Sequence, residues 1–161
     1  VPVAWGTDLP VGALLNTLDV EAAAAFDALT RSGEIDTLVR QGENTWPNVF
    51  RTARFVPAVE HVQMDRLRVD LMEQAHAVLQ DLDVLASPSF GGDTLGITNL
   101  TGHPCVCLPN ALRPVEDGPA ARRQPGSISF VAPLYDDHKA LRLAHAVQQQ
   151  TDLHTRRPPI R

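Results

Sequence analysis

The sequence predicts an α/β protein, and three observations lead to this class. Apolar residues recur at helical spacing through the first half, proline and glycine then become frequent, and short apolar runs follow. Only 4 of the 13 prolines precede residue 86, whereas 7 lie within 88–133, where glycine is also enriched. Since both residues break helices and shape turns, we expect 1–82 to be mainly helical and 83–161 to hold strands, loops and a C-terminal helix.

Composition narrows the classes of function. The chain has 161 residues, enough for one core, with 43% hydrophobic and 20% charged residues, as in globular proteins. The net charge of −5 argues against a nucleic-acid surface, and no apolar run approaches the roughly 20 residues of a membrane span. The opening residues do not resemble a secretory signal, and two close cysteines do not make a disulfide framework. We therefore expect a cytoplasmic protein with no nucleic-acid or membrane partner.

Four to five helices are expected. The first spans 20–31, with Asp19 as its N-cap and a Ser-Gly stop, and short helices follow at 35–41 and 47–54. The longest spans 57–82, about 40 Å at 1.5 Å per residue, a length that suggests further structure packing against it. The last spans 137–150 behind Asp136. The apolar stripe of the longest helix comprises Val59, Val62, Leu67, Leu71, Ala75, Val78, Leu79 and Leu82.

Three strands are expected, at 83–87, 104–108 and 127–132. The first two are short apolar runs, typical of strands covered on both faces, so Cys105 and Cys107 are expected to be buried. The third alternates, with Ile128, Phe130 and Ala132 on one side. The polar, proline-rich segment 113–124 predicts a hairpin or loop. A sheet of three strands is small for the number of expected helices. This is a second indication that the sequence belongs to a larger structure.

Residue spacing alone offers no convincing catalytic or metal site. Ser89, Asp93 and His103 could form a nucleophilic triad, but no G-x-S-x-G elbow exposes the serine, and a strand end with a turn explains the pattern better. His103, Cys105 and Cys107 lack the second ligand pair of a zinc site. The paired aspartates at 81/83 and 136/137 fit turns and helix caps. The only lysine, Lys139, falls at a helix start, so an activated lysine base is not expected.

Three segments make the sequence resemble the amidase signature family. Residues 54–63, with Arg66 and Arg68, resemble a helix of its C-terminal side. Asp83-Val-Leu-Ala-Ser-Pro88 looks like its D-V-L-x-x-P strand and loop, and Asn99-Leu-Thr-Gly-His-Pro104 is similar to its N-L-T-G-x-P turn and strand. The ending, with 127–136, a helix and 151–154, agrees in order and spacing. The resemblance covers roughly residues 46–160, and the Asn99–Pro104 block is its most specific part.

The resemblance implies the C-terminal portion of that family's α/β/α fold, a mixed sheet flanked by helices. Enzymes of the family hydrolyse a carboxamide, or transfer its ammonia, with a serine nucleophile, a second serine in a cis peptide and a lysine. Neither a metal nor an organic cofactor is implied. The substrate would be a small-molecule amide.

No residue here matches the family's Gly/Ser-rich catalytic block, so no catalytic residue is assigned. We expect a C-terminal fragment that is inactive alone, lacks the N-terminal catalytic core, and pairs with that core or self-associates through its exposed sheet. Asn99, Thr101 and His103 are expected beside the substrate cleft, unless Asn99 and Thr101 only satisfy backbone groups of a turn. The alternatives are a free-standing interaction module derived from that domain and a small hydrolase using Ser89 and His103.

Overall fold

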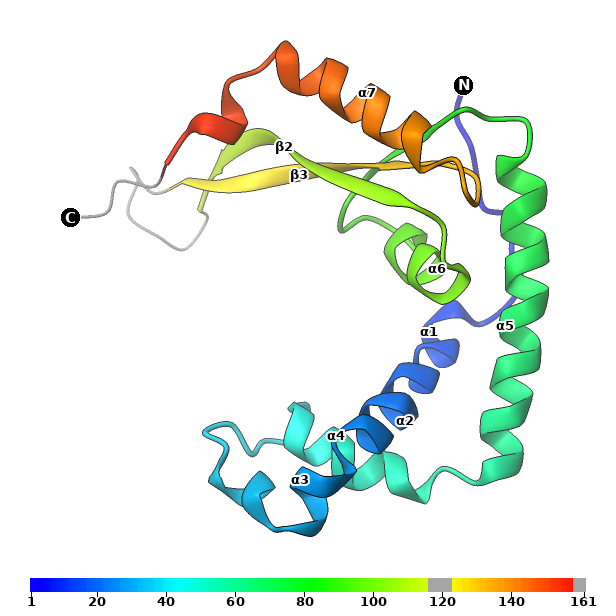
Figure 1. The fold of residues 1–161 in the computed structure, drawn as a ribbon, viewed down its shortest axis with the longest axis vertical. Coiled ribbons are helices and arrows are strands. Elements are labelled where there is room, and N and C mark those ends of the chain that lie inside the picture. The colour runs from blue at the N-terminus through cyan, green and yellow to red at the C-terminus, as the bar shows by residue number, and fades with distance from the viewer. Residues whose placement is uncertain (116–122, 158–161) are drawn as a thin grey trace. The chain divides into compact units, whose positions relative to one another are not determined.

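The computed structural model describes residues 1–115 and 123–157 and confirms the α/β class with its three strands (Figure 1). The chain divides into two compact units. The helical unit is Asp8–Leu71, and the sheet unit combines Val1–Thr7 with Met72–Arg161. The boundary between them falls within one long helix, α5 (Ala58–Leu79).

The helical unit consists of short helices around a small aromatic and aliphatic core. That core is formed by Ala23, Ile35, Phe50 and Ala53, and the rings of Phe26 and Phe50 stack with centroids 4.9 Å apart. Besides the start of α5, its helices are α1 (Val11–Leu14), α2 (Asn16–Ala25), α3 (Asp27–Arg31) and α4 (Trp46–Thr52), with 3₁₀ turns at Glu34–Thr37 and Ala53–Phe55.

The predicted helix at 20–31 was wrong in its start and its continuity. Asp19 lies inside α2 rather than capping it, and Phe26, at φ −102° and ψ 25°, separates α2 from α3. The chain is already helical before residue 20: α1 buries Leu14, and Thr17 in the first turn of α2 is also 1% exposed. Burying a leucine is worth about 1.5–3 kcal/mol, more than the ~1 kcal/mol of a typical N-cap, so packing outweighs a helix start at Asp19.

The predicted helix at 35–41 is reduced to the 3₁₀ turn Glu34–Thr37. The side-chain amide of Gln41 donates to the carbonyls of Ile35 (2.9 Å) and Leu38 (2.8 Å). These bonds satisfy carbonyl groups that a continuing helix would have paired with backbone N–H groups, so the chain turns away without leaving them unpaired.

Helix α5 confirms the long predicted helix to within three residues at its end. Leu71, Ala75 and Leu79 are buried as the apolar stripe predicts, but Val59 and Val62 are 68% and 50% exposed. The stripe therefore packs toward the C-terminal end of α5 and is left open near its start.

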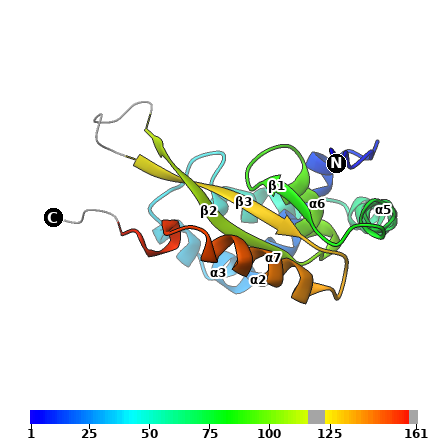
Figure 2. The same ribbon diagram turned by 90° about the horizontal axis from the view of Figure 1, so that it is seen from above.

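The sheet unit contains β1 (Leu85–Pro88), α6 (Thr94–Thr101), β2 (Cys105–Pro114), β3 (Arg123–Val131), α7 (Asp137–Gln149) and a 3₁₀ turn at Leu153–Thr155. The strand order is β1-β3-β2, and both pairs are antiparallel. Helix α7 contacts β2 and β3 on one side of the sheet, and α6 lies on the other side (Figures 1 and 2). Helix α7 buries Ala140 and Ala144, and β3 buries Phe130 and Val131.

Strands β2 and β3 extend into both ends of 113–124, the segment predicted to be a hairpin or loop, and pair antiparallel there. The pairs Leu112–Pro125 and Arg113–Gln124 belong to the ladder, while 116–122 lie outside the described residues. Proline is tolerated because β2 is an edge strand and because, among the described residues, Pro125 of β3 has a ladder partner in β2 and none in β1. Between Pro109 and Ala111, β2 contains one more residue than the facing part of β3, so the register of their pairing shifts by one residue.

The two cysteines are exposed, contrary to the prediction that they are buried. Cys105 and Cys107 share one face of β2, whereas Val106 and Leu108, on the other face, are half-buried. An apolar run does not show whether a strand lies at the centre or the edge of its sheet, and β2 lies at the edge. The predicted alternation in β3 is also absent at its end, where residues 129–132 are all buried.

Candidate functional site

The block Asn99–Pro104 forms the end of a helix and not the turn that the sequence predicts. Asn99 and Thr101 lie in α6, which ends at Gly102 in the left-handed conformation (φ 76°). The Gly102 N–H donates to the carbonyl of Thr98 at 2.9 Å, as in a helix C-cap. Pro104 then prevents the helix from continuing and leads into β2.

The structure brings two of the three expected site residues together. Thr101 and His103 are 2% and 4% exposed, and Thr101 Oγ1 lies 2.7 Å from His103 Nδ1. Asn99 is exposed on α6, where its amide donates to the carbonyl of Leu95 at 2.8 Å. Two helix positions separated by two residues point in different directions, so Asn99 cannot share the site of Thr101.

His103 is almost fully buried, between the end of α6 and the start of β2. Burial, followed by the neighbouring His76, lowers the pKa of His103 below its ordinary value of 6.5, because both disfavour the charged imidazolium. Its Nε2 atom is buried and has no hydrogen-bond partner among the residues that the structure describes. The lowered pKa favours the neutral imidazole, in which one ring nitrogen donates and the other accepts.

Ser89 does not form the triad that its position in the sequence allows. Ser129 Oγ donates to Ser89 Oγ at 2.9 Å, and Cys107 Sγ lies 3.2 Å from the same oxygen. His103 bonds to Thr101 instead, and no hydrogen bond joins it to Ser89 within the described part of the chain. Among the described residues, Ser89 consequently has no hydrogen-bonded histidine, lysine or carboxylate to activate it.

Sequence reasoning missed Cys107 and Ser129 as partners of Ser89. Ser129 pairs across the sheet with both Ser87 and Cys107, so these three side chains share one face. The strand order β1-β3-β2, which the sequence does not reveal, places them in a row. Nothing in their spacing along the chain could have indicated it.

A second polar chain connects the N-terminus to α6. The indole N–H of Trp5 donates to Thr94 Oγ1 at 2.9 Å, and Ser87 Oγ donates to the same oxygen at 3.1 Å. Thr94 is buried and begins α6. These bonds attach the first residues and β1 to the helix that holds Thr101.

Lys139 takes part in an ion-pair cluster. Its ammonium lies 2.9 Å from Asp136 and 3.3 Å from Asp83. The hydrogen bonds that Lys139 donates to Asp136, and then to Asp83, raise the pKa of Lys139, so this lysine is charged and cannot act as a neutral base. Over 1–115 and 123–157, no three His, Cys, Asp or Glu side chains lie close enough together to hold a metal ion.

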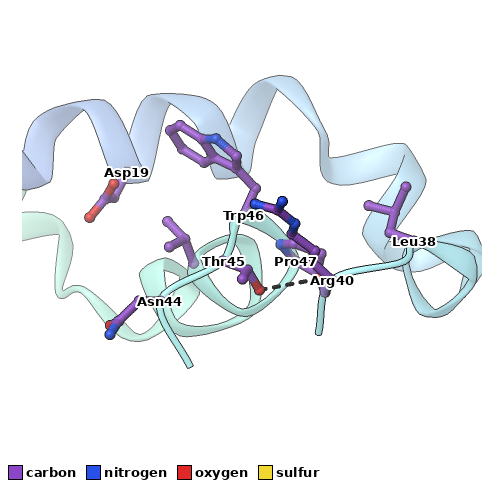
Figure 3. Close-up of a pocket in the computed structure, with 8 residues that line it drawn as sticks. Asp19, Leu38, Arg40, Asn44, Thr45, Trp46 and Pro47 are labelled. Carbon is purple, nitrogen blue, oxygen red and sulfur yellow. Dashed lines mark hydrogen bonds between the residues drawn. The ribbon is translucent and has the colours of Figure 1, made fainter. Parts of the chain in front are cut away.

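The helical unit holds a pocket of about 560 Å³ that sequence reasoning did not find (Figure 3). Its walls come from α2, from the segment after the first 3₁₀ turn, and from the start of α4. The lining residues are Asp19, Leu38, Arg40, Asn44, Thr45, Trp46, Pro47 and Val49. Segments from 19 to 49 meet here only in the folded chain, so no local pattern marks the pocket.

In the described ranges, no helix combines the length and apolar character needed to cross a membrane. No family model matches the chain, and no solved structure is detectably similar to it.

The chain is similar in sequence to the protein named "Putative amidase AmiD" in Mycobacterium tuberculosis and in Mycobacterium bovis. The identity is 30% over an alignment of 125 residues, which takes in 64% of this chain and 25% of the relative. The chain thus spans about a quarter of the length of the curated relatives that it matches. These comparisons support a relationship to an amidase.

Proposed function

We propose that this chain is the C-terminal part of an amidase of the signature type, an enzyme that hydrolyses the C–N bond of a small carboxamide. The observation that supports this most strongly is the 30% identity to AmiD over a quarter of that protein's length. The Asn99–Pro104 block adds a motif of the same family. In this proposal the chain completes the enzyme's sheet and shapes its substrate cleft, and the preceding part supplies the catalytic groups.

The chemistry of the described residues fits an enzyme in which the catalytic groups come from the preceding part. Amide hydrolysis by a serine needs a base that accepts the hydroxyl proton while the oxygen attacks the carbonyl carbon. Ser89 bonds to Ser129 and Cys107, and Lys139 is held charged by two aspartates. Neither residue meets the requirement, and in this proposal the nucleophile and the base come from the preceding part of the enzyme.

The surfaces of both units favour a larger assembly. In the sheet unit, β1 and β2 each present an unpaired edge, and such edges are usually covered or blunted in complete proteins. Large apolar side chains are also exposed: Phe90 (88%), Tyr135 (92%) and Leu141 (58%) in the sheet unit, and Val59 (68%), Val62 (50%) and Val69 (53%) in the helical unit. Side chains of this kind commonly mark contacts with further protein.

The two exposed free thiols suit a reducing compartment, so we place the enzyme in the cytoplasm.

Within this proposal, Thr101 and His103 lie below the surface of the cleft, where they position α6, and they do not touch substrate. Both are almost fully buried, and their bond fixes the junction between α6 and β2. Asn99, which is exposed at the same end of α6, is the member of the three that can face a ligand.

Reading the coding sequence upstream of Val1 tests the proposal. An in-frame extension that encodes a lysine and a Gly/Ser-rich block is the expected result. A start codon immediately before Val1 would overturn it and leave the interaction module as the better interpretation.

A further inference from the structure

The pocket of the helical unit presents opposite charges on either side of an aromatic ring. Asp19 projects from α2, and Arg40 comes from the segment between the 3₁₀ turn Glu34–Thr37 and α4. In Figure 3 the ring of Trp46 lies between the Asp19 carboxylate and Leu38, and Arg40 approaches from the Leu38 side. Leu38, Pro47 and Val49 add apolar wall, so the lining alternates acid, apolar surface and base.

Trp46 is supported by other rings, although it is 51% exposed. Its ring lies 5.6 Å from that of Phe50, which is 5% exposed and stacks on Phe26 at 4.9 Å. A ring held in this way loses little conformational freedom when a ligand covers it. Trp46 therefore provides a preformed apolar platform.

The segment that brings Arg40 to the pocket is held by its own hydrogen bonds. The Thr45 hydroxyl lies 2.6 Å from the carbonyl of Gly42 and 3.2 Å from that of Arg40, the contact drawn in Figure 3. The amide of Asn48 donates to the carbonyl of Glu43 at 2.9 Å. These bonds hold the backbone of the pocket wall, so the pocket exists before any ligand arrives.

Within the part of the chain that the structure describes, the two charged groups of the pocket have no ion-pair partner, unlike several charged residues near them. In the same unit, Arg31 and Arg54 pair with Asp27, and Arg51 pairs with Asp36. In the described part of this unit, no ion pair or side-chain hydrogen bond engages the Asp19 carboxylate or the Arg40 guanidinium. An unpaired acid and an unpaired base thus face one cavity.

From this arrangement we propose that the pocket binds a small zwitterion whose ammonium and carboxylate are separated by an apolar body. The Asp19 carboxylate accepts hydrogen bonds from the ligand's ammonium, and the planar guanidinium of Arg40 donates to the ligand's carboxylate. The ligand's methylene groups cover the ring of Trp46. The volume of about 560 Å³ lies within the roughly 300–1,000 Å³ of small-molecule sites. This site belongs to the helical unit and does not rest on the proposed amide hydrolysis.

Both charges are needed because each contributes little by itself. Ion pairs at a solvent-exposed surface are weak, and Arg40 is exposed while Asp19 is half-buried. A ligand that makes both contacts and covers the ring gains three contributions, whereas an amine or an acid gains two. We expect a dissociation constant on the order of 1 mM for the zwitterion and about tenfold weaker binding for either singly charged relative.

The test uses the chain's two tryptophans as reporters. In ¹H–¹⁵N spectra of the 161-residue chain, the indole signal of Trp46 should shift and saturate with 5-aminopentanoate, while that of Trp5 should stay in place. Pentylamine and pentanoate should bind about tenfold more weakly, and L-leucine, whose charges are adjacent, should not reproduce the zwitterion's effect. Absence of a saturable Trp46 shift, or equal affinity for all four compounds, would overturn the proposal.

Variants separate the two charges. Asp19→Asn should reduce the affinity for 5-aminopentanoate to that for pentanoate, and Arg40→Gln should reduce it to that for pentylamine. Asp70→Asn and Arg66→Gln make the same charge changes on exposed residues of α5 outside the pocket lining and should leave the affinity unchanged. Equal losses in pocket and control variants would indicate a general charge effect and contradict the site. All four positions are at least partly exposed, and unchanged spectral dispersion confirms that each variant folds.

Discussion

Thr101 and His103 are joined by a hydrogen bond whose direction the structure determines. The Thr101 hydroxyl donates to the carbonyl of Ile97 at 2.8 Å, and its oxygen lies 2.7 Å from His103 Nδ1. A hydroxyl has one proton, so this oxygen must accept from an Nδ1–H group. The imidazole is therefore the Nδ1–H tautomer, and its buried Nε2 is left as an acceptor.

The first prediction concerns this tautomer. ¹⁵N spectra of the histidine ring at neutral pH should show His103 protonated at Nδ1 only. Thr101→Val leaves the Nδ1–H buried without an acceptor and should lower the free energy of unfolding by about 1–3 kcal/mol. Thr101→Ser keeps the hydroxyl and serves as the matched control, expected to retain the Nδ1–H signal. A ring protonated at Nε2 in the unmodified chain would contradict the assignment.

The second prediction concerns pH. Because the folded pKa of His103 is lowered from 6.5, the unfolded chain binds more protons between the two pKa values. The part of the free energy of unfolding that depends on a neutral His103 is fully present above pH 6.5. It is lost as the pH falls through the folded pKa, at up to about 1.4 kcal/mol per pH unit. Urea unfolding of the sheet unit from pH 7.5 to 5 should show this slope. His103→Asn can still donate to Thr101 and should flatten it; an unchanged slope in this variant would assign the effect to other groups.

The third prediction concerns the thiols. Cys105 and Cys107 are exposed on an edge strand, so both should react with a disulfide reagent in the native chain without denaturant. Cys105→Ala should leave one reactive thiol. Reaction only after urea is added would show that this face of β2 is covered in solution, as self-association through the sheet would require.

The fourth prediction concerns the buried serine pair. Ser89→Ala removes the acceptor for Ser129 and should destabilise the chain by about 1–2 kcal/mol in urea unfolding. Ser129→Ala should cost a similar amount, and the double variant less than the sum of the two, because both changes remove the same bond. Strict additivity would mean that the bond contributes nothing.

Elements with a regular local pattern could be predicted from the sequence, as α5, α7 and the three strands show. Helix α6 was missed because Gly96, Ile97 and Thr98 are poor helix formers. It forms because Ile97 and Leu100 are buried, while the hydroxyls of Thr98 and Thr101, which are also buried, are satisfied by carbonyls one turn earlier. Such stabilisation depends on tertiary packing and leaves no periodic signal.

The failure to predict α6 also made the prediction of the site residues partly wrong. Once α6 is a helix, Asn99 and Thr101 must point in different directions, which a turn would not require. The relationship of Ser89 to Ser129 depends on a sheet order that spacing does not encode. The pocket around Trp46 likewise depends on α2 meeting a segment that lies about 20 residues later in the chain.

In the proposed function, this chain contributes structure to an amidase whose catalytic groups lie elsewhere. The measurement is ammonia release from primary carboxamides such as benzamide and hexanamide, with the 161-residue chain compared with the same chain joined to its upstream reading frame. We expect release by the longer protein only, and an unchanged rate when the longer protein carries Ser89→Ala. Release by the 161-residue chain alone, abolished by Ser89→Ala, would show instead that the chain carries its own nucleophile.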